Sequence, residues 1–271
     1  MRLLLRSWNV FHGNALPPER RAYLEEAVRL VTADAPDLLC LQEVPAWALP
    51  YLGGWSGMRS FPALAAPPRI GPLPSTATLG RALTSLHHGV LRSAFSGQGN
   101  AILARPTLRP LDERTLVLND RRFRRAQARW LGLGAVARLA WAKERRVCQA
   151  VRFADHEGGG LLLANLHATA YRADGRLADA ELLRAAVFAD ALAEPVDVCV
   201  LAGDFNVRAG RSRTLADLTA PDWGFGGGGF GVDHLLARGA PIASVERWPE
   251  HRRLVAGRVV SDHAPVEAWI G

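Results

Sequence analysis

The sequence predicts an α/β fold on three observations. Short apolar runs rich in Val and Leu recur along the chain, which is typical of buried strands. Between several of these runs, apolar residues recur every three or four positions, which indicates amphipathic helices. The chain has 271 residues, of which 49% are hydrophobic and 22% charged. It can therefore bury a large core, as one sizeable α/β domain or as two small ones.

The N-terminal part alternates strand, helix and strand. The expected elements are a strand over Leu3-Leu4-Leu5 ending at Ser7-Trp8-Asn9-Val10, a helix starting at Pro17-Pro18-Glu19 and stopped by Pro36-Asp37, and a strand from Leu38 to Leu41 ending in Gln42-Glu43-Val44. Residues 45 to 97 are rich in Pro, Gly, Ala and Ser. This composition predicts long loops with little regular structure.

The remaining two thirds of the chain continue the alternation. The expected elements are a strand from Gly99 to Leu103, a basic helical insertion over residues 121 to about 142, a hairpin of Val147–Phe153 and Leu161–Leu166 across residues 155 to 160, a helix from about Leu177 to Leu192, a strand from Val196 to Leu201, a flexible glycine-rich loop from Gly224 to Gly231, a strand over residues 232 to 236, and a last strand after Pro265. Gly132 and Gly134 weaken the helical pattern of the insertion.

Charge is concentrated in two parts of the chain. The six arginines between Glu43 and Asp112 are accompanied by no acidic residue. Residues 121 to 146 hold nine basic residues against Glu144 alone, a net charge of +8. Subtracting these charges of +6 and +8 from the total of +7 leaves −7 for the rest of the chain. A basic surface of this kind attracts phosphates and anionic membranes.

The cysteines and the N-terminus indicate the compartment. Cys40, Cys148 and Cys199 are widely spaced, and two of them lie in apolar strand-like runs, so we expect reduced core residues rather than disulfides or a zinc site. No apolar run approaches the roughly 20 residues of a membrane-spanning helix. The first strand begins almost at Met1, which leaves no room for a signal peptide. We expect a cytoplasmic protein.

The segment Leu201-Ala202-Gly203-Asp204-Phe205-Asn206-Val207 is the most informative stretch. An apolar run leads into it, and Asp204 and Asn206 then share one face because alternate side chains of an extended chain point the same way. A carboxylate beside an amide suits a water or phosphate oxygen near a hard cation. The alternative is a strand that ends in a polar turn, where Asp and Asn are common.

Polar residues recur at other strand ends. Asn9, Glu43, His167, Asp204 and Asn206 each end an apolar strand, and Asp233, Asp262 and His263 stand at the start of one. Singly, each has an ordinary explanation: an Asn or Asp that caps a turn, a solvated Glu43, or a buried histidine such as His167. Together they indicate a site at one rim of a sheet, because sites are usually built at strand ends.

The set of motifs resembles the endonuclease/exonuclease/phosphatase superfamily, in its deoxyribonuclease-like and sphingomyelinase-like branches. The motifs that carry the resemblance are Ser7-Trp8-Asn9-Val10, Leu41-Gln42-Glu43-Val44, Gly99-Asn100-Ala101-Ile102-Leu103, Asn165-Leu166-His167, Gly203-Asp204-Phe205-Asn206, Asp233-His234 and Ser261-Asp262-His263-Ala264-Pro265. The resemblance implies a single domain over residues 1–271 with a basic insertion at about 121–146. It implies a four-layer α/β sandwich, with two packed, mostly antiparallel sheets flanked by helices, and metal-dependent cleavage of phosphate esters.

The resemblance also implies roles for the residues. The expected Mg²⁺ ligands, for which Mn²⁺ could substitute, are Glu43, Asn9 and Asp262. The expected catalytic residues are Asp204 at the attacking water, Asn206 and His263 at the phosphate, Asp233 orienting His263, and His167 as general acid to the leaving group, with Asn100 as a substrate contact. One departure is that no carboxylate stands near Gln98-Gly99-Asn100 to support His167.

Substrate class depends on the insertion. Its arginines Arg121, Arg122, Arg124 and Arg125, together with Trp130 and Trp141, fit a nucleic-acid contact, an anionic membrane surface, or a helix that packs on the core and solvates its arginines. We expect an Mg²⁺-dependent phosphodiesterase that acts on nucleic acid and has no obligate protein partner. The alternatives are a hydrolase of phospholipids or small phosphate esters and, from another class, a non-catalytic basic binding module.

Overall fold

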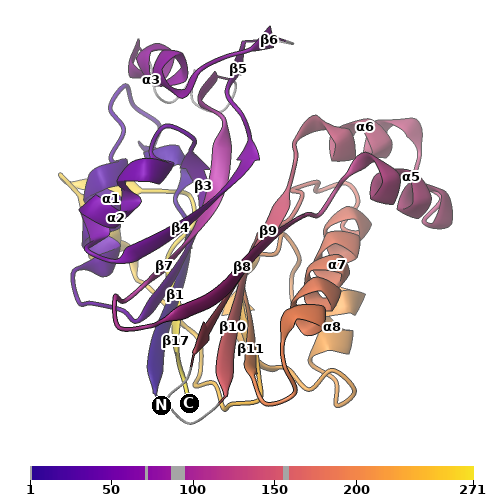
Figure 1. Cartoon of the computed structure of the whole chain (residues 1–271). Coiled ribbons are helices and arrows are strands. Elements are labelled where there is room, and N and C mark those ends of the chain that lie inside the picture. The colour runs from indigo at the N-terminus through magenta and orange to yellow at the C-terminus, as the bar shows by residue number, and fades with distance from the viewer. Residues whose placement is uncertain (1, 71–72, 87–94, 155–158) are drawn as a thin grey trace.

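The computed structural model describes residues 2–70, 73–86, 95–154 and 159–271, and it shows two sheets packed face to face between outer helices (Figure 1). In the described residues, each large sheet has six strands. The first has the order β14 (Glu246–Arg247), β17 (Val266–Ile270), β1 (Leu3–Asn9), β3 (Leu38–Pro45), β7 (Gln98–Ala104) and β4 (Arg59–Ala66). The second has the order β12 (Gly226–Phe230), β13 (Asp233–Arg238), β11 (Val198–Asp204), β10 (Gly160–His167), β9 (Val147–Ala154) and β8 (Pro110–Val117). The predicted α/β sandwich is confirmed.

Helices form the two outer layers. The first sheet is covered by α1 (Leu24–Thr32) and α2 (Leu52–Ser56), and the second by α7 (Arg176–Leu192) and α8 (Arg213–Leu218) (Figure 1). At the end of the sandwich away from both termini lie α3 (Ala77–Leu86) on one side and the pair α5 (Arg121–Trp130) and α6 (Ala135–Lys143) on the other (Figure 1). The minor elements are β2 (Ala15–Leu16), β5 (Arg69–Ile70), β6 (Leu73–Pro74), β15 (Leu254–Val255), β16 (Arg258–Val260) and short 3-10 turns at Phe11–Gly13, Leu49–Tyr51 and Glu250–Arg253. In the described part of the chain, no helix is both long and apolar enough to span a membrane.

Each sheet packs against the other sheet on one face and against helices on the other, so its strands carry apolar side chains on both faces. Side chains alternate along a strand. Leu38 and Cys40 of β3 therefore join the core between the sheets, whereas Leu39 and Leu41 pack under α1. The three cysteines are free and buried, as predicted.

Two parallel strand pairs bring distant residues to one edge. In the first sheet β1 is parallel to β3, and in the second β10 is parallel to β11, while the other neighbours in both sheets are antiparallel. The carboxyl ends of a parallel pair lie at the same edge. Asn9 and Glu43 therefore meet at one rim of the first sheet, and His167 and Asp204 meet at the facing rim of the second.

A pair of buried amides joins the two sheets directly beneath this rim. Gln42 of β3 donates through Nε2 to Oδ1 of Asn165 of β10 at 2.8 Å. The Asn165 amide nitrogen in turn donates to the carbonyl oxygens of Leu41 and Ala101, each at 3.0 Å. Both amide side chains are fully buried, so they can be held only by such internal hydrogen bonds.

The structure corrects two predictions of loops. Residues 45 to 97 contain α2, α3 and the full-length strand β4, which pairs with β7 and places Phe61, Ala63 and Ala65 inward. Pro62 is tolerated because β4 lies at the edge of its sheet. The glycine-rich segment contains the strand β12, in which a Cβ at Gly229 would lie 2.1 Å from the Asp233 carbonyl oxygen. Glycine here allows the backbone to approach its partner strand and is not a sign of a loop.

Other boundaries differ less. The first helix begins at Leu24 rather than at Pro17, because Ala15 and Leu16 pair with β16 instead. The predicted basic helix is two helices, broken where Gly132 adopts φ +62°. Strand β8 was not predicted. The hairpin of β9 and β10 is confirmed. Its turn was predicted over residues 155 to 160, of which residues 155 to 158 lie outside the described residues.

Candidate active site

Glu43 reaches the rim from a strained turn of the backbone. The pairing of β3 with β7 shifts register between Leu41 and Val44, and Glu43 within this irregularity adopts φ +54°. Such a conformation costs a residue with a side chain about 1–3 kcal/mol and is found where surrounding structure enforces it. Asn206 likewise adopts φ +51° and Ser261 φ +67°. Strain in the described residues is therefore concentrated beside the predicted site.

Asp204 is fixed by the glycine that precedes it. Gly203 has φ +136°, and a Cβ there would lie 2.0 Å from the Leu166 carbonyl oxygen, so only glycine fits. The buried Asp204 carboxylate then accepts a hydrogen bond through Oδ1 from the backbone N–H of Asn206 at 3.0 Å. Its other oxygen, Oδ2, faces the centre of the site.

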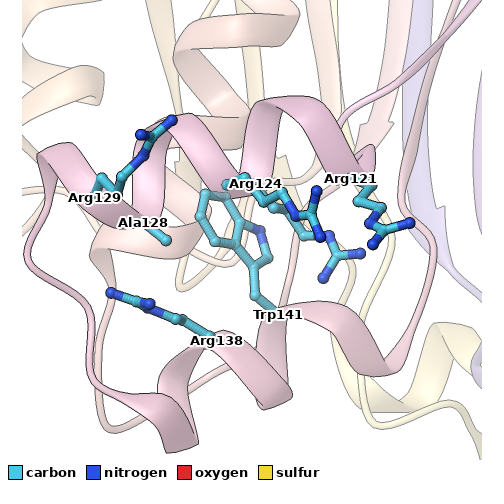
Figure 2. Close-up of a pocket in the computed structure, with 7 residues that line it drawn as sticks. Arg121, Arg124, Ala128, Arg129, Arg138 and Trp141 are labelled. Carbon is cyan, nitrogen blue, oxygen red and sulfur yellow. The ribbon is translucent and has the colours of Figure 1, made fainter.

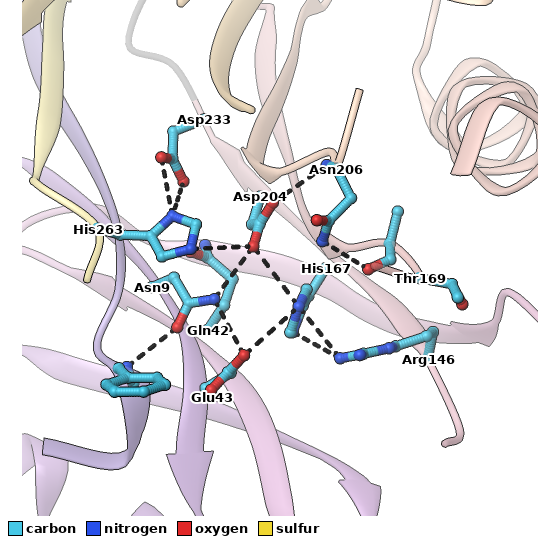
Figure 3. Close-up of polar contacts among 12 residues, drawn as sticks. Asn9, Gln42, Glu43, Arg146, His167, Thr169, Asp204, Asn206, Asp233 and His263 are labelled. Carbon is cyan, nitrogen blue, oxygen red and sulfur yellow. Dashed lines mark hydrogen bonds and ion pairs between the residues drawn. The ribbon is translucent and has the colours of Figure 1, made fainter. Parts of the chain in front are cut away.

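Asn9 links the two carboxylates of the site (Figure 3). Its amide nitrogen donates to Asp204 Oδ2 at 3.1 Å and to Glu43 Oε1 at 3.3 Å. Its amide oxygen accepts from the backbone N–H of Phe11 at 3.0 Å. In this arrangement Asn9 positions the carboxylates, and its predicted role as a metal ligand through that oxygen stays a prediction.

His263 is held by Asp233 (Figure 3). The Nδ1 atom of His263 lies 2.9 and 3.0 Å from the two Asp233 oxygens, and Nε2 lies 3.8 Å from Asp204 Oδ2. Burial lowers the pKa of His263, but the Asp233 hydrogen bond and the charge of Asp204 outweigh it and raise the pKa to about 10. In the metal-free protein this imidazole is protonated at neutral pH, and Asp233 orients it as predicted for such a pair.

His167 has the opposite environment. Its Nε2 lies 3.6 Å from Asp204 Oδ2 and 3.8 Å from Glu43 Oε1. Arg146 Nη1 lies 3.0 and 3.1 Å from its two ring nitrogens. Burial and then the Arg146 charge hold the pKa of His167 well below its usual 6.5. His167 is therefore neutral in the free protein, with the Arg146 guanidinium nearer to its ring than either carboxylate.

The two carboxylates resist ionisation. Burial, followed by the charge of Asp233, raises the pKa of Asp204 to about 7. Burial also raises the pKa of Glu43. A general base works best when its pKa lies near the working pH, which suits Asp204 to take a proton from water.

The remaining predicted residues lie at different distances from this centre. Asp262 is exposed, and its charge acts on both Glu43 and His263, so it lies beside them. Asn206 donates through its side chain to the Ala168 carbonyl oxygen at 2.9 Å. Asn100 is buried, and its amide donates to the Val147 carbonyl oxygen at 3.2 Å. The predicted arginine contacts Arg121, Arg122, Arg124 and Arg125 all belong to α5, apart from the central cluster.

Sequence reasoning missed two residues of the cluster. In the sequence Arg146 is one of many arginines in a basic segment, and the signal that could have found it is its place immediately before a strand antiparallel to β10. His12 Nε2 lies 3.6 Å from Glu43 Oε2, and the side chain is buried. Its signal is that it follows Asn9 by three residues, within the turn that leaves β1.

The donor set fits a divalent cation. Asp204, Asp233 and His263 each offer a ligand atom, and these atoms lie within 4.8 Å of one another. Asp233 is occupied by His263, so Glu43, with Asp262 beside it, is the better candidate for a hard, oxygen-preferring ion. Burial raises the pKa of Glu43, which means that its charged form is poorly stabilised in the free protein, and a bound cation would stabilise it.

Comparison with known proteins agrees with this geometry. The sequence profile of the Endonuclease/Exonuclease/phosphatase family matches residues 7–263. No curated protein matches the chain closely enough to count as a relative.

Solved structures resemble the chain over its whole length. An endonuclease/exonuclease/phosphatase from Bacteroides vulgatus has a TM-score of 0.67 at 14% identity, covering 100% of this chain and 99% of that one. A functionally unknown protein from Enterococcus faecalis V583 has 0.66 at 16%, covering 99% of each. D. rerio TDP2 in complex with a single-strand DNA product has 0.63 at 15%, covering 100% and 99%. At these identities the likeness shows the fold alone.

Proposed function

Because the chain belongs to the endonuclease/exonuclease/phosphatase family, we propose that it is a divalent-metal-dependent phosphodiesterase that cleaves nucleic acid. Family membership supports hydrolysis of phosphate esters. The observation that carries the proposal is the pair of carboxylates, Glu43 and Asp204, joined by Asn9 and placed between two histidines of opposite protonation state.

Each residue of the site has a separate role in the proposed hydrolysis. Asp204, with a pKa near neutrality, accepts the proton of the attacking water. The protonated His263 stabilises the negative charge that develops on the phosphoryl oxygens, and Asp233 holds its ring in place. Glu43, with Asp262 beside it, would hold Mg²⁺ or Mn²⁺. A bound divalent ion would supply further charge neutralisation at the phosphate.

The leaving-group side of the site is assigned to Arg146 and His167. A general acid must carry a proton, and burial together with the Arg146 charge holds the pKa of His167 well below its usual value, so its ring is neutral in the free protein. We therefore propose that the Arg146 guanidinium balances the charge on the departing oxygen, that His167 positions this oxygen by hydrogen bonding, and that the oxygen takes its proton from water after departure. This proposal differs from the general-acid role that the family resemblance implies for His167, which stays a prediction.

Nucleic acid is proposed as the substrate on the basic character of α5 and α6. The D. rerio TDP2 structure holds a single-strand DNA product, and this chain, which has a similar fold, carries an excess of arginine on α5 at one end of the sandwich. Arg121, Arg122, Arg124 and Arg125 would meet the phosphate backbone, and Asn100 and Asn206 would act nearer to the scissile phosphate.

Metal dependence tests the proposal. Hydrolysis of plasmid, single-stranded DNA, RNA and bis-p-nitrophenyl phosphate should vanish in chelator and return with Mg²⁺ or Mn²⁺. Glu43→Gln should weaken metal binding in calorimetry, whereas the exposed Glu246→Gln on edge strand β14 should not. Full activity in excess chelator would contradict the proposal. Folding should survive metal removal, because a sandwich of this size does not depend on one ion.

A further inference from the structure

A cavity of about 440 Å³ lies between α5 and α6. Its lining consists of Arg121, Arg124, Arg125, Ala128, Arg129, Arg138 and Trp141, and we call it the arginine pocket. Figure 2 shows the Trp141 side chain between the two helices, with Arg124 beside it and Arg138 extending from α6. A volume of this size is within the range of ligand sites.

Two guanidinium groups of the arginine pocket are held in fixed orientations by the backbone. Nε of Arg124 donates to the Asn119 carbonyl oxygen at 2.7 Å, and Nε of Arg138 donates to the Leu133 carbonyl oxygen at 2.8 Å. These bonds use one N–H of each fork and leave the terminal amino groups for another acceptor. The lining is therefore partly ordered before any ligand arrives.

No acidic side chain in the described residues forms an ion pair with the five arginines of the pocket. The nearest carboxylates in sequence are engaged elsewhere: Asp120 pairs with Arg184 at 2.6 Å, and Glu144 pairs with Arg146 at 2.8 Å. Five like charges around one cavity repel each other. An anion with several oxygens relieves that repulsion and can accept from several guanidinium forks at once.

The floor of the pocket is attached to the active-site strand. Trp141 donates through Nε1 to the buried Glu181 at 2.5 Å. The Glu181 carboxylate also accepts from the backbone N–H and the hydroxyl of Thr169, at 2.6 and 2.8 Å. Thr169 follows His167 by two residues. A ligand in the pocket is therefore held by a rigid support that continues into the reaction centre.

We propose that the arginine pocket binds phosphate groups of a polynucleotide at a distance from the scissile phosphate. This inference rests on the proposed function, because it makes the pocket a second contact for the same substrate chain. It adds that the substrate is longer than one phosphodiester and that its backbone crosses α5 and α6.

The exposed apolar side chains of the two helices favour nucleic acid over a membrane. Trp130, Val136 and Leu139 are 82%, 71% and 72% exposed. At 100° per residue, Trp130 lies about 180° around α5 from Arg121, and Val136 and Leu139 lie about 140–160° around α6 from Trp141. Membrane-surface helices immerse their apolar face and keep basic residues along its borders. The lining residues Arg121 and Trp141 therefore lie on the faces of α5 and α6 that point away from those apolar side chains.

Binding in chelator, which prevents cleavage, tests the pocket directly. The double variant Arg129→Gln/Arg138→Gln is compared with Arg59→Gln/Arg247→Gln, which removes two exposed arginines outside the pocket. With fluorescein-labelled single-stranded DNA, the slope of log affinity against log salt should flatten by about 0.7 for each phosphate that the pocket variant no longer neutralises. The slope of the control variant should equal that of the parent. Turnover of bis-p-nitrophenyl phosphate with Mg²⁺ should be the same in all three proteins.

The outcomes separate the two proposals. Equal salt slopes in the parent and the pocket variant would overturn the pocket assignment even if both proteins hydrolyse the small ester. Failure of the parent to hydrolyse any ester would overturn the proposed function, while a changed salt slope would still support a phosphate-binding pocket. Loss of binding to phosphatidylserine-containing vesicles, with DNA binding unchanged, would also overturn the assignment and identify a membrane surface.

Discussion

The reaction centre and the arginine pocket use charge in opposite ways. At the centre, groups of opposite charge lie within 4 Å of one another, as with Asp204 and the protonated His263, and the backbone of Glu43 and Asn206 is strained. In the pocket, charges of one sign lie on regular helices. The comparison teaches that catalysis in a buried cluster of mixed charge depends on the position of each atom, whereas anion binding on a basic surface depends on the number of positive charges. The two regions should therefore respond very differently to substitution.

The largest difference is expected from His263→Ala. It removes an imidazolium at the phosphate, and losing such a group typically costs about 10²–10⁴-fold in rate. Both DNA and bis-p-nitrophenyl phosphate should be affected, as measured by kcat/KM. Arg129→Gln provides the comparison, since it should leave turnover of the small ester unchanged. A His263→Ala enzyme within threefold of the parent on both substrates would remove His263 from the mechanism.

A smaller effect is expected from His167→Ala, at about tenfold, which corresponds to about 1.4 kcal/mol. Because burial and the Arg146 charge keep His167 neutral, the loss should be the same on a p-nitrophenyl ester and on a dinucleotide with a poor leaving group. If the loss shrinks on the p-nitrophenyl ester, His167 does protonate the leaving group. Arg146→Gln removes the smaller of these two causes, so in an NMR titration we expect the pKa of His167 to rise but to stay below 6.5.

Asp233→Asn should change the titration of His263 and leave the fold largely unchanged. The variant replaces the charged carboxylate that raises the pKa of His263 with a neutral amide, so this pKa should fall from about 10 in a histidine NMR titration of chelator-treated protein. Since the folded pKa lies above the usual 6.5, protonation of His263 stabilises the fold fully below pH 6.5. That contribution is lost as the pH rises through 10. An unchanged His263 titration would show that Asp233 does not control the ring.

The smallest effect on chemistry is expected from Trp141→Phe, under the arginine pocket. It removes the donor to Glu181 and leaves a buried carboxylate with one partner fewer, which should cost about 1–3 kcal/mol in the free energy of unfolding. Urea unfolding measures this cost, and turnover of the small ester should be kept. If Trp141→Phe lowers the turnover of the small ester as well as the stability, the pocket and the reaction centre are coupled and do not act as two separate regions.

The strand-end residues of the centre could be predicted from sequence because each follows an apolar run. Asn9, Glu43, His167 and Asp204 were all found in this way, and the structure brings them together. Two strands escaped because they lack a run of Val and Leu: β4 is rich in Ala and contains Pro62, and β12 is four glycines followed by Phe230.

The partner of His167 was missed because it can be recognised only through the pairing of two strands. Arg146 meets it only because β9 and β10 pair as a hairpin, so a residue 21 positions earlier returns to the rim. Neither the residue type at position 146 nor its distance along the chain from His167 indicates that the two side chains meet at the rim. The protonation states are hidden for the same reason, since they depend on which charges become neighbours.

The buried amides Gln42 and Asn165 have a mechanical consequence. Apolar contact between two sheets has no preferred direction, whereas a hydrogen bond requires its donor and acceptor at a set distance and angle. The hydrogen bonds of Gln42 and Asn165 therefore fix how the two sheets lie against each other immediately below the reaction centre. Hydrogen bonds from Asn9 to Asp204, from Asn100 to Val147 and from Gln149 to Phe61 also join the two sheets. A shift of one sheet against the other would break these bonds together, so the two facing rims keep their relative position and Glu43 stays opposite Asp204.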